Sequence, residues 1–112
     1  MQNNLTWQEF SKVEMRVGTI LTANEFPEAN NPAFILTIDF GELGIKKTSA
    51  QITQLYKTEE LIGKQIVAVV NLPKKQIATM QSECLVLGGI GNEKNVTLLT
   101  LDKPIENGAR IG

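Results

Sequence analysis

Apolar and polar side chains alternate along much of this chain, and the pattern predicts β-strands. Between positions 34 and 40, phenylalanine, leucine and isoleucine occupy every second position. Successive side chains of a strand point to opposite faces, so a strand is predicted over 33–41 with one buried and one solvated face. Gly18 predicts a bulge or a sharp bend in an earlier strand. Similar patterns and short apolar runs predict strands over 15–26, 45–52, 66–70, 84–87 and 96–101, with a loop over 71–81.

Local capping signals predict two short helices. The segment Thr6-Trp7-Gln8-Glu9 has the form of a capping box, and it predicts a helix over 7–12 with Trp7 and Phe10 on one face. Thr58 is the predicted N-cap of a helical turn, because two acidic residues follow it and Gly63 is placed to end it.

The order of these elements predicts an all-β fold with short helices. A short N-terminal helix, three strands, a helical turn and further short strands suit a small closed barrel. An SH3-like barrel is the alternative, but the helical turn between the third and fourth strands favours the OB-fold. The length of 112 residues suits one domain. We therefore predict a single five-stranded OB-fold barrel over residues 1–112.

Composition narrows the classes of function. The chain has no histidine, which removes histidine-based catalysis and most zinc sites. It also has no glycine-rich loop ending in Lys-Ser or Lys-Thr, the usual phosphate-binding motif of ATPases. We therefore expect a protein that is not an enzyme, with no catalytic residue, no metal and no cofactor.

Residue usage also indicates the compartment. The longest apolar run, Ile66 to Val70, has five residues, whereas a membrane-spanning helix needs about twenty. The polar N-terminus does not have the pattern of a signal peptide. The single cysteine, Cys84, fits a reducing compartment and a small buried strand residue. We expect a cytoplasmic protein that does not insert into membranes.

Charge is unevenly distributed, although the net charge is only −1. Residues 1–45 carry two basic and six acidic side chains, a net −4, whereas residues 46–112 carry nine basic and six acidic ones, a net +3. Two lysine doublets stand out, Lys46-Lys47 and Lys74-Lys75. A local basic patch can bind phosphate, and solvated surface is the alternative interpretation. Neighbours on a strand face opposite ways, so only one lysine of the first doublet can share a surface with the second. Lys47 is the predicted one.

Several segments resemble a known family. Val13–Gly18, and Asn71–Lys75 followed by Ser82-Glu83, are similar to the opening strand and the asparagine-loop-serine signature of the tRNA-binding domain family. That family includes the C-terminal appendages of methionyl-tRNA synthetases and free-standing tRNA-binding proteins. The chain is most similar to its small, cytoplasmic, export-related bacterial chaperones, through residues 26–29, 36–47, 49–53, 67–71 and 107–112.

The resemblance implies a homodimer of OB-folds that binds unfolded or preprotein segments in protein export without ATP. Its interface would join the extensions 1–14 and 104–112. The predicted N-terminal helix agrees with this, because a helix so short needs a partner surface. The alternative is a structure-specific tRNA-binding protein that contacts tRNA phosphates through loop lysines. The expected interface side chains are Trp7, Phe10, Ala109 and Ile111.

Two overlapping sets of side chains are the candidate sites. The candidates for RNA binding are Lys47, Asn71, Lys74, Lys75 and Ser82. The candidates for peptide binding are Gln51, Asn71 and Met80.

Structural roles remain open for several of these residues. Asn71 can bond backbone groups instead of a ligand, Ser82 can brace the loop, and Met80 can tuck into the barrel end. For Glu83 we expect bracing, because a carboxylate repels phosphate. Phe34 is expected in the core rather than stacked on a base.

Overall fold

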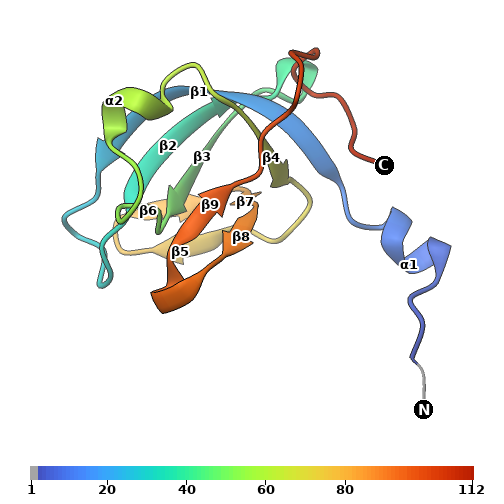
Figure 1. Ribbon diagram of the computed structural model, residues 1–112, viewed down its shortest axis with the longest axis horizontal. Helices are drawn as coiled ribbons and strands as arrows, with labels where there is room; N and C mark the ends of the chain where they lie inside the picture. The colour runs from blue at the N-terminus through green and yellow to red at the C-terminus, as the bar shows by residue number, and fades with distance from the viewer. Residues whose placement is uncertain (1–2) are drawn as a thin grey trace.

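Five antiparallel strands form the main sheet, in the order β3-β2-β1-β4-β7 (Figure 1). The computed structural model describes residues 3–112. Residues 19–25 pair with β2, whereas residues 15–19 pair with β4, so β1 serves both halves of the sheet. The strands are β1 (Met15–Glu25), β2 (Phe34–Asp39), β3 (Ile45–Ala50), β4 (Gln65–Val69) and β7 (Leu85–Val86).

The two ends of this sheet meet, which makes a nearly closed barrel. The Thr48 hydroxyl on β3 donates to the Cys84 carbonyl just before β7 at 2.7 Å. Thr48 is itself buried, so this bond lies at the seam of the barrel. The mostly β fold and the OB-fold-like barrel are as predicted from the sequence.

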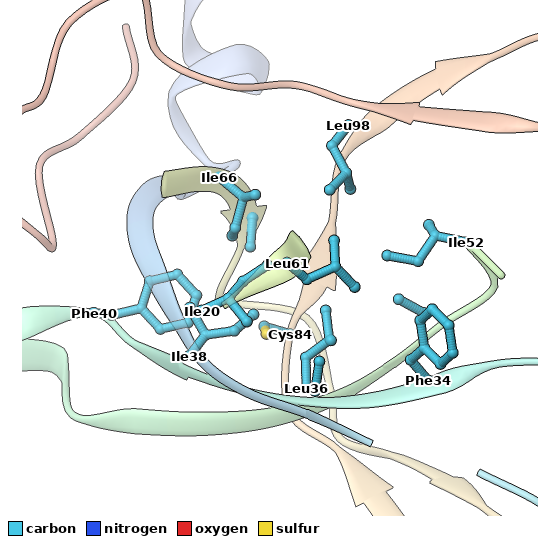
Figure 2. Close-up of a cluster of buried hydrophobic side chains, with 13 residues drawn as sticks. Ile20, Phe34, Leu36, Ile38, Phe40, Ile52, Leu61, Ile66, Cys84 and Leu98 are labelled. Atoms are coloured by element: carbon cyan, nitrogen blue, oxygen red, sulfur yellow. The ribbon is translucent and has the colours of Figure 1, made fainter. Parts of the chain in front are cut away.

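The alternating pattern of β2 decides which side chains form the core. Phe34, Leu36 and Ile38 are buried, while the residues between them are only partly covered. Figure 2 shows these side chains in one cluster with Ile20 from β1 and Ile66 from β4. The prediction that Phe34 belongs to the core is therefore confirmed.

Both short helices form where they were predicted. In α1 (Trp7–Ser11) the Glu9 amide donates to the Thr6 hydroxyl at 3.1 Å, and the Thr6 amide donates to the Glu9 carboxylate at 2.9 Å, which completes the capping box. These hydrogen bonds from Thr6 hold the pKa of Glu9 below its ordinary value. The N-cap of α2 (Thr58–Leu61) is Lys57 rather than Thr58, one residue earlier than predicted, and its amide donates to Glu60.

The segment predicted as a loop over 71–81 contains a β-hairpin, so that prediction was wrong. Strands β5 (Lys75–Ile77) and β6 (Met80–Ser82) pair across a turn in which Ala78 has a φ of 49°. Tight hairpin turns are normally recognised in a sequence by Asn-Gly or a similar pair of residues. Here the turn residues are alanine and threonine, so the usual signal is absent.

The remaining elements are short. A second small sheet pairs β8 (Gly88–Ile90) with β9 (Val96–Leu98), and 3-10 turns lie at η1 (Gly41–Leu43) and η2 (Asn92–Lys94). Nowhere in residues 3–112 is there a helix whose length and apolar character would suit a membrane span.

Gly18 does not form the predicted bulge. The register of β1 against β2 shifts between Ile20 and Thr22 instead. Gly18 is needed for space, because a Cβ atom there would lie 2.5 Å from the Ile38 side chain and 2.7 Å from the Phe40 ring. Gly18 does mark a special position in β1, but the reason is close packing against Ile38 and Phe40 rather than a bulge.

The C-terminal tail runs along the edge of β1 that β2 leaves uncovered. The Val17 amide donates to Ala109 at 2.9 Å, and the Ile111 amide donates to Met15 at 2.9 Å. Asn107 anchors the start of this tail by accepting a hydrogen bond from the Thr19 hydroxyl at 2.7 Å. Ala109 and Ile111 are half-buried as a result.

Candidate functional site

A groove of about 590 Å³ opens on the barrel wall. Its walls come from the 28–33 loop, the end of β3 and the β5–β6 hairpin. A volume of this size is typical of ligand sites. Apolar side chains form its floor, namely Ile52, Cys84, Val86, Val96 and Leu98, and Leu85 lies at its edge half exposed.

Three of the candidate residues line this groove: Gln51, Lys75 and Ser82. The Gln51 side chain is exposed. The Ser82 hydroxyl lies 2.9 Å from that of Thr48 and 3.3 Å from the Cys84 carbonyl, so it braces the barrel seam. Gln51 and Lys75 remain available to a ligand.

The candidate lysines come together around Glu83. The Lys47 amide donates to the Glu83 carboxylate at 2.9 Å, and the Lys74 ammonium lies 3.7 Å from the same carboxylate. Lys75 pairs with Ser82 on the hairpin, directly before Glu83. The predicted bracing role of Glu83 fits these contacts. We call Lys47, Lys74 and Lys75 the basic rim; all three are exposed, whereas Lys46 on the other face of β3 is partly buried.

Asn71 lies away from the groove, at the base of α1. Its amide nitrogen donates to the Lys12 carbonyl at 2.6 Å, and its amide oxygen accepts from the Glu14 amide at 3.0 Å. Both ends of the side chain are therefore engaged in joining α1 to β1.

Met80 does not supply an exposed contact, so this part of the peptide-site prediction was wrong. Its side chain is buried in a small second cluster with Phe26 and Ala33. On β6, Met80 and Ser82 share one face while Gln81 points the opposite way, and that shared face packs against the barrel. The alternative considered from the sequence, a packing role for Met80, describes its position.

Sequence reasoning missed the amides on the groove walls, Asn30, Asn31 and Gln76, and the apolar edge residue Leu85. The sequence of a polar loop with two asparagines does not show which distant residues the loop will lie beside, so the groove could not be predicted from it.

The thiol of Cys84 is poorly reactive, although Cys84 lines the groove. Burial raises the pKa of its thiol to about 11 from an ordinary 9.0. The thiol therefore stays protonated at neutral pH, and only the thiolate is a strong nucleophile or metal ligand. Among residues 3–112 no three histidine, cysteine or acidic side chains are grouped to hold a metal ion.

The C-terminal tail reaches the end of α1. Trp7 is 86% exposed and no residue of α1 is buried, and Figure 1 shows α1 standing clear of the barrel. Arg110 of the tail donates to the Ser11 carbonyl at 2.8 Å, so the tail reaches the end of α1. Of the predicted interface side chains, Phe10, Ala109 and Ile111 are partly covered within this one chain. Residues 1 and 2 of the predicted extension lie outside the described residues.

Comparison with known proteins identifies the family. The model of the putative tRNA binding domain matches residues 15–110, so the chain belongs to the tRNA-binding domain family. It is 39% identical over 104 residues to a methionine–tRNA ligase of Leptospira biflexa and 33% identical over 107 residues to that of Thermococcus kodakarensis. The two alignments include 93% and 96% of this chain but only 15% and 14% of the length of those ligases.

Solved structures define the type within this family. The chaperone CsaA of Bacillus anthracis is 48% identical, with a TM-score of 0.94, over 98% of this chain and 100% of that one. The CsaA chaperone of Picrophilus torridus is 50% identical, with a TM-score of 0.90, over 97% and 100%. The protein is therefore a CsaA-type tRNA-binding domain protein, a class to which chaperone or tRNA-binding roles apply.

Proposed function

We propose that this protein is a non-catalytic chaperone that binds unfolded or preprotein segments in its groove, in the cytoplasm and without ATP. The observation that carries the proposal is the groove itself, which combines an apolar floor with polar walls. Similarity to two CsaA chaperones over nearly the full length of each supports it. The resemblance to export-related chaperones makes preproteins the expected targets.

Leu85 offers a test that leaves the core intact. It is 50% exposed at the groove edge, so Leu85→Glu adds a charge where an apolar segment would lie. We expect binding of a labelled apolar peptide to weaken roughly tenfold or more, because the charge must lose water when the peptide docks. Fluorescence anisotropy without nucleotide measures this.

Leu55→Glu is the matched control, because Leu55 is 48% exposed and lies outside the groove. It should bind the peptide as the unchanged protein does. Equal binding by all three proteins would show that the peptide site is elsewhere.

A second function, binding of tRNA, is favoured by the basic rim. The main-chain amide of Lys47 and the ammonium of Lys74 both contact the Glu83 carboxylate, and Lys75 pairs with Ser82, the residue before Glu83. Glu83 offsets one of the three charges, which leaves a net positive surface suited to a short stretch of phosphates. The match to the tRNA-binding domain supports this alternative.

Replacing all three rim lysines by alanine should weaken tRNA binding and flatten its dependence on salt. Each lost phosphate contact lowers the slope of log affinity against log salt by roughly one unit. Filter binding at several salt concentrations gives the slope. The control replaces Lys57, Lys64 and Lys103, which keeps the net charge equal but leaves the rim intact. A slope equally reduced in both variants would argue against a specific rim site.

The proposed chaperone acts as a homodimer. The apolar side chains of α1 face solvent in the single chain, and a helix of five residues is too short to be stable without a covering surface. The adjoining tail offers the second half of a two-fold contact.

A further inference from the structure

Three side-chain amides on the groove walls have no hydrogen-bond partner among residues 3–112. Asn30, Asn31 and Gln51 line the groove, are exposed, and form no hydrogen bond with any other described residue. Gln76 uses its nitrogen on the Ala78 carbonyl at 2.9 Å, which leaves its oxygen open. Asn71 differs, because both ends of its amide bind backbone groups of the protein.

These amides stand over an apolar floor, and on more than one wall. Asn30 and Asn31 belong to the 28–33 loop, Gln51 follows β3, and Gln76 lies on the hairpin. An amide side chain offers both a donor and an acceptor, which are the same groups that each peptide unit presents. An extended segment in the groove would thus find partners for its main chain beside a surface for its apolar side chains.

The charged side chains that line the groove, and the lack of aromatic ones among its described residues, suit a peptide better than a nucleic acid. The charged side chains lining the groove are Glu28 and Lys75, one of each sign, so the groove interior favours an uncharged segment. No described residue of the groove is aromatic. Proteins that read unpaired bases generally stack them on aromatic rings, and the groove offers no such platform.

We infer that the groove recognises the main chain of an extended apolar peptide through the amides of Asn30, Asn31 and Gln51. This inference rests on the proposed chaperone function and adds the recognition chemistry to it. Main-chain recognition leaves the peptide sequence largely unread, so one groove can accept many segments whose common property is an apolar, uncharged surface.

The test compares an apolar peptide with a version N-methylated at alternate residues. Methylation removes N–H donors but keeps every side chain. We expect the unchanged protein to bind the methylated peptide about tenfold more weakly or worse, because several hydrogen bonds of ordinary net strength are lost. In the triple variant Asn30→Ala, Asn31→Ala, Gln51→Ala, the unmodified peptide should also bind about tenfold more weakly. Methylation should then have little further effect.

Asn24→Ala, Gln54→Ala, Asn92→Ala is the matched control, since these amides are exposed outside the groove. It should behave as the unchanged protein does. Equal affinity of the unchanged protein for both peptides would overturn the inference while leaving the chaperone function standing. Failure of the unmodified peptide to bind would overturn both. Displacement of the peptide by an unpaired RNA oligomer, with no effect of methylation, would assign the groove to bases instead. If the triple variant unfolds, the comparison of the two peptides on the unchanged protein still decides.

Discussion

Gly18 occupies a position in β1 where the barrel has no room for a side chain. Ile38 and Phe40 are fully buried, and they fill the space above the glycine. Phe40, the residue after β2, therefore packs its ring against β1 where β1 has no side chain. A single missing side chain thus lets the wall of a small barrel curve around its core.

Gly18→Ala should destabilise the protein by about 1–3 kcal/mol, because an extra methyl group in a filled core forces neighbours off their preferred positions. Urea denaturation followed by circular dichroism gives the free energy of unfolding. Gly89→Ala is the control, since the nearest atom to a Cβ there is 3.9 Å away. A loss for Gly18→Ala no larger than for the control would contradict this reading.

At the scale of elements, the Asn71 side-chain amide helps to set the position of α1. Asn71 follows β4 and reaches the chain between α1 and β1, with hydrogen bonds to Lys12 and Glu14. The Val70 amide donates to the Glu14 carbonyl at 2.9 Å beside it. The helix has no buried residue of its own, so these contacts and the one from Arg110 set its direction.

Asn71→Ala should leave the barrel folded while loosening the α1–β1 junction. We expect a cost of roughly 1 kcal/mol in unfolding free energy, the usual net value of a hydrogen bond at a partly solvated site. Hydrogen exchange at the Glu14 amide should become faster. Asn24→Ala removes an exposed amide of β1 that has no such bonds, and it should change neither quantity. Unchanged exchange at Glu14 in Asn71→Ala would show that other contacts hold the junction.

At the scale of the whole molecule, two strongly exposed apolar side chains lie on the N-terminal segment, whose helix the C-terminal tail reaches. Trp7, the first residue of α1, is 86% exposed, and Leu5, just before this projecting helix, is 67% exposed. Soluble monomers rarely leave such side chains together in water. The 28–33 loop and the β5–β6 hairpin, which line the groove, lie away from α1 in Figure 1, so a dimer through α1 and the tail would leave two grooves free for ligands.

Trp7→Ala should weaken this dimer roughly tenfold or more, since large aromatic side chains dominate interface energies. The fold should be unaffected, because the Trp7 side chain is almost fully exposed. Deleting residues 1–12 should give monomer or aggregate. Sedimentation equilibrium measures both effects. Ile90→Ala, at a side chain 80% exposed on the β8–β9 hairpin, is the control and should leave the association unchanged. A dimer of unchanged affinity in Trp7→Ala would remove α1 from the interface.

The candidate site shows how far sequence reasoning reached. The gathering of Lys47 with Lys74 depends on Glu83, which lies 36 residues from Lys47 along the chain. The alternation of side chains along β3 was enough to choose Lys47 rather than Lys46 as the lysine that shares a surface with Lys74 and Lys75. The burial of Met80 was not accessible in the same way, because the residues that cover it, Phe26 and Ala33, come from a distant loop.

The sequence by itself determined the five strands of the main sheet, the two helices and the barrel class. Side-chain alternation has a period of two residues, and a capping box spans four residues, so both are readable from neighbours. Tertiary structure alone decided that Asn71 braces α1 across 57 and 59 residues, and that the amides of Asn30 and Gln51 share one groove. These outcomes depend on which distant segments come into contact when the barrel closes, and a local sequence pattern does not specify such contacts.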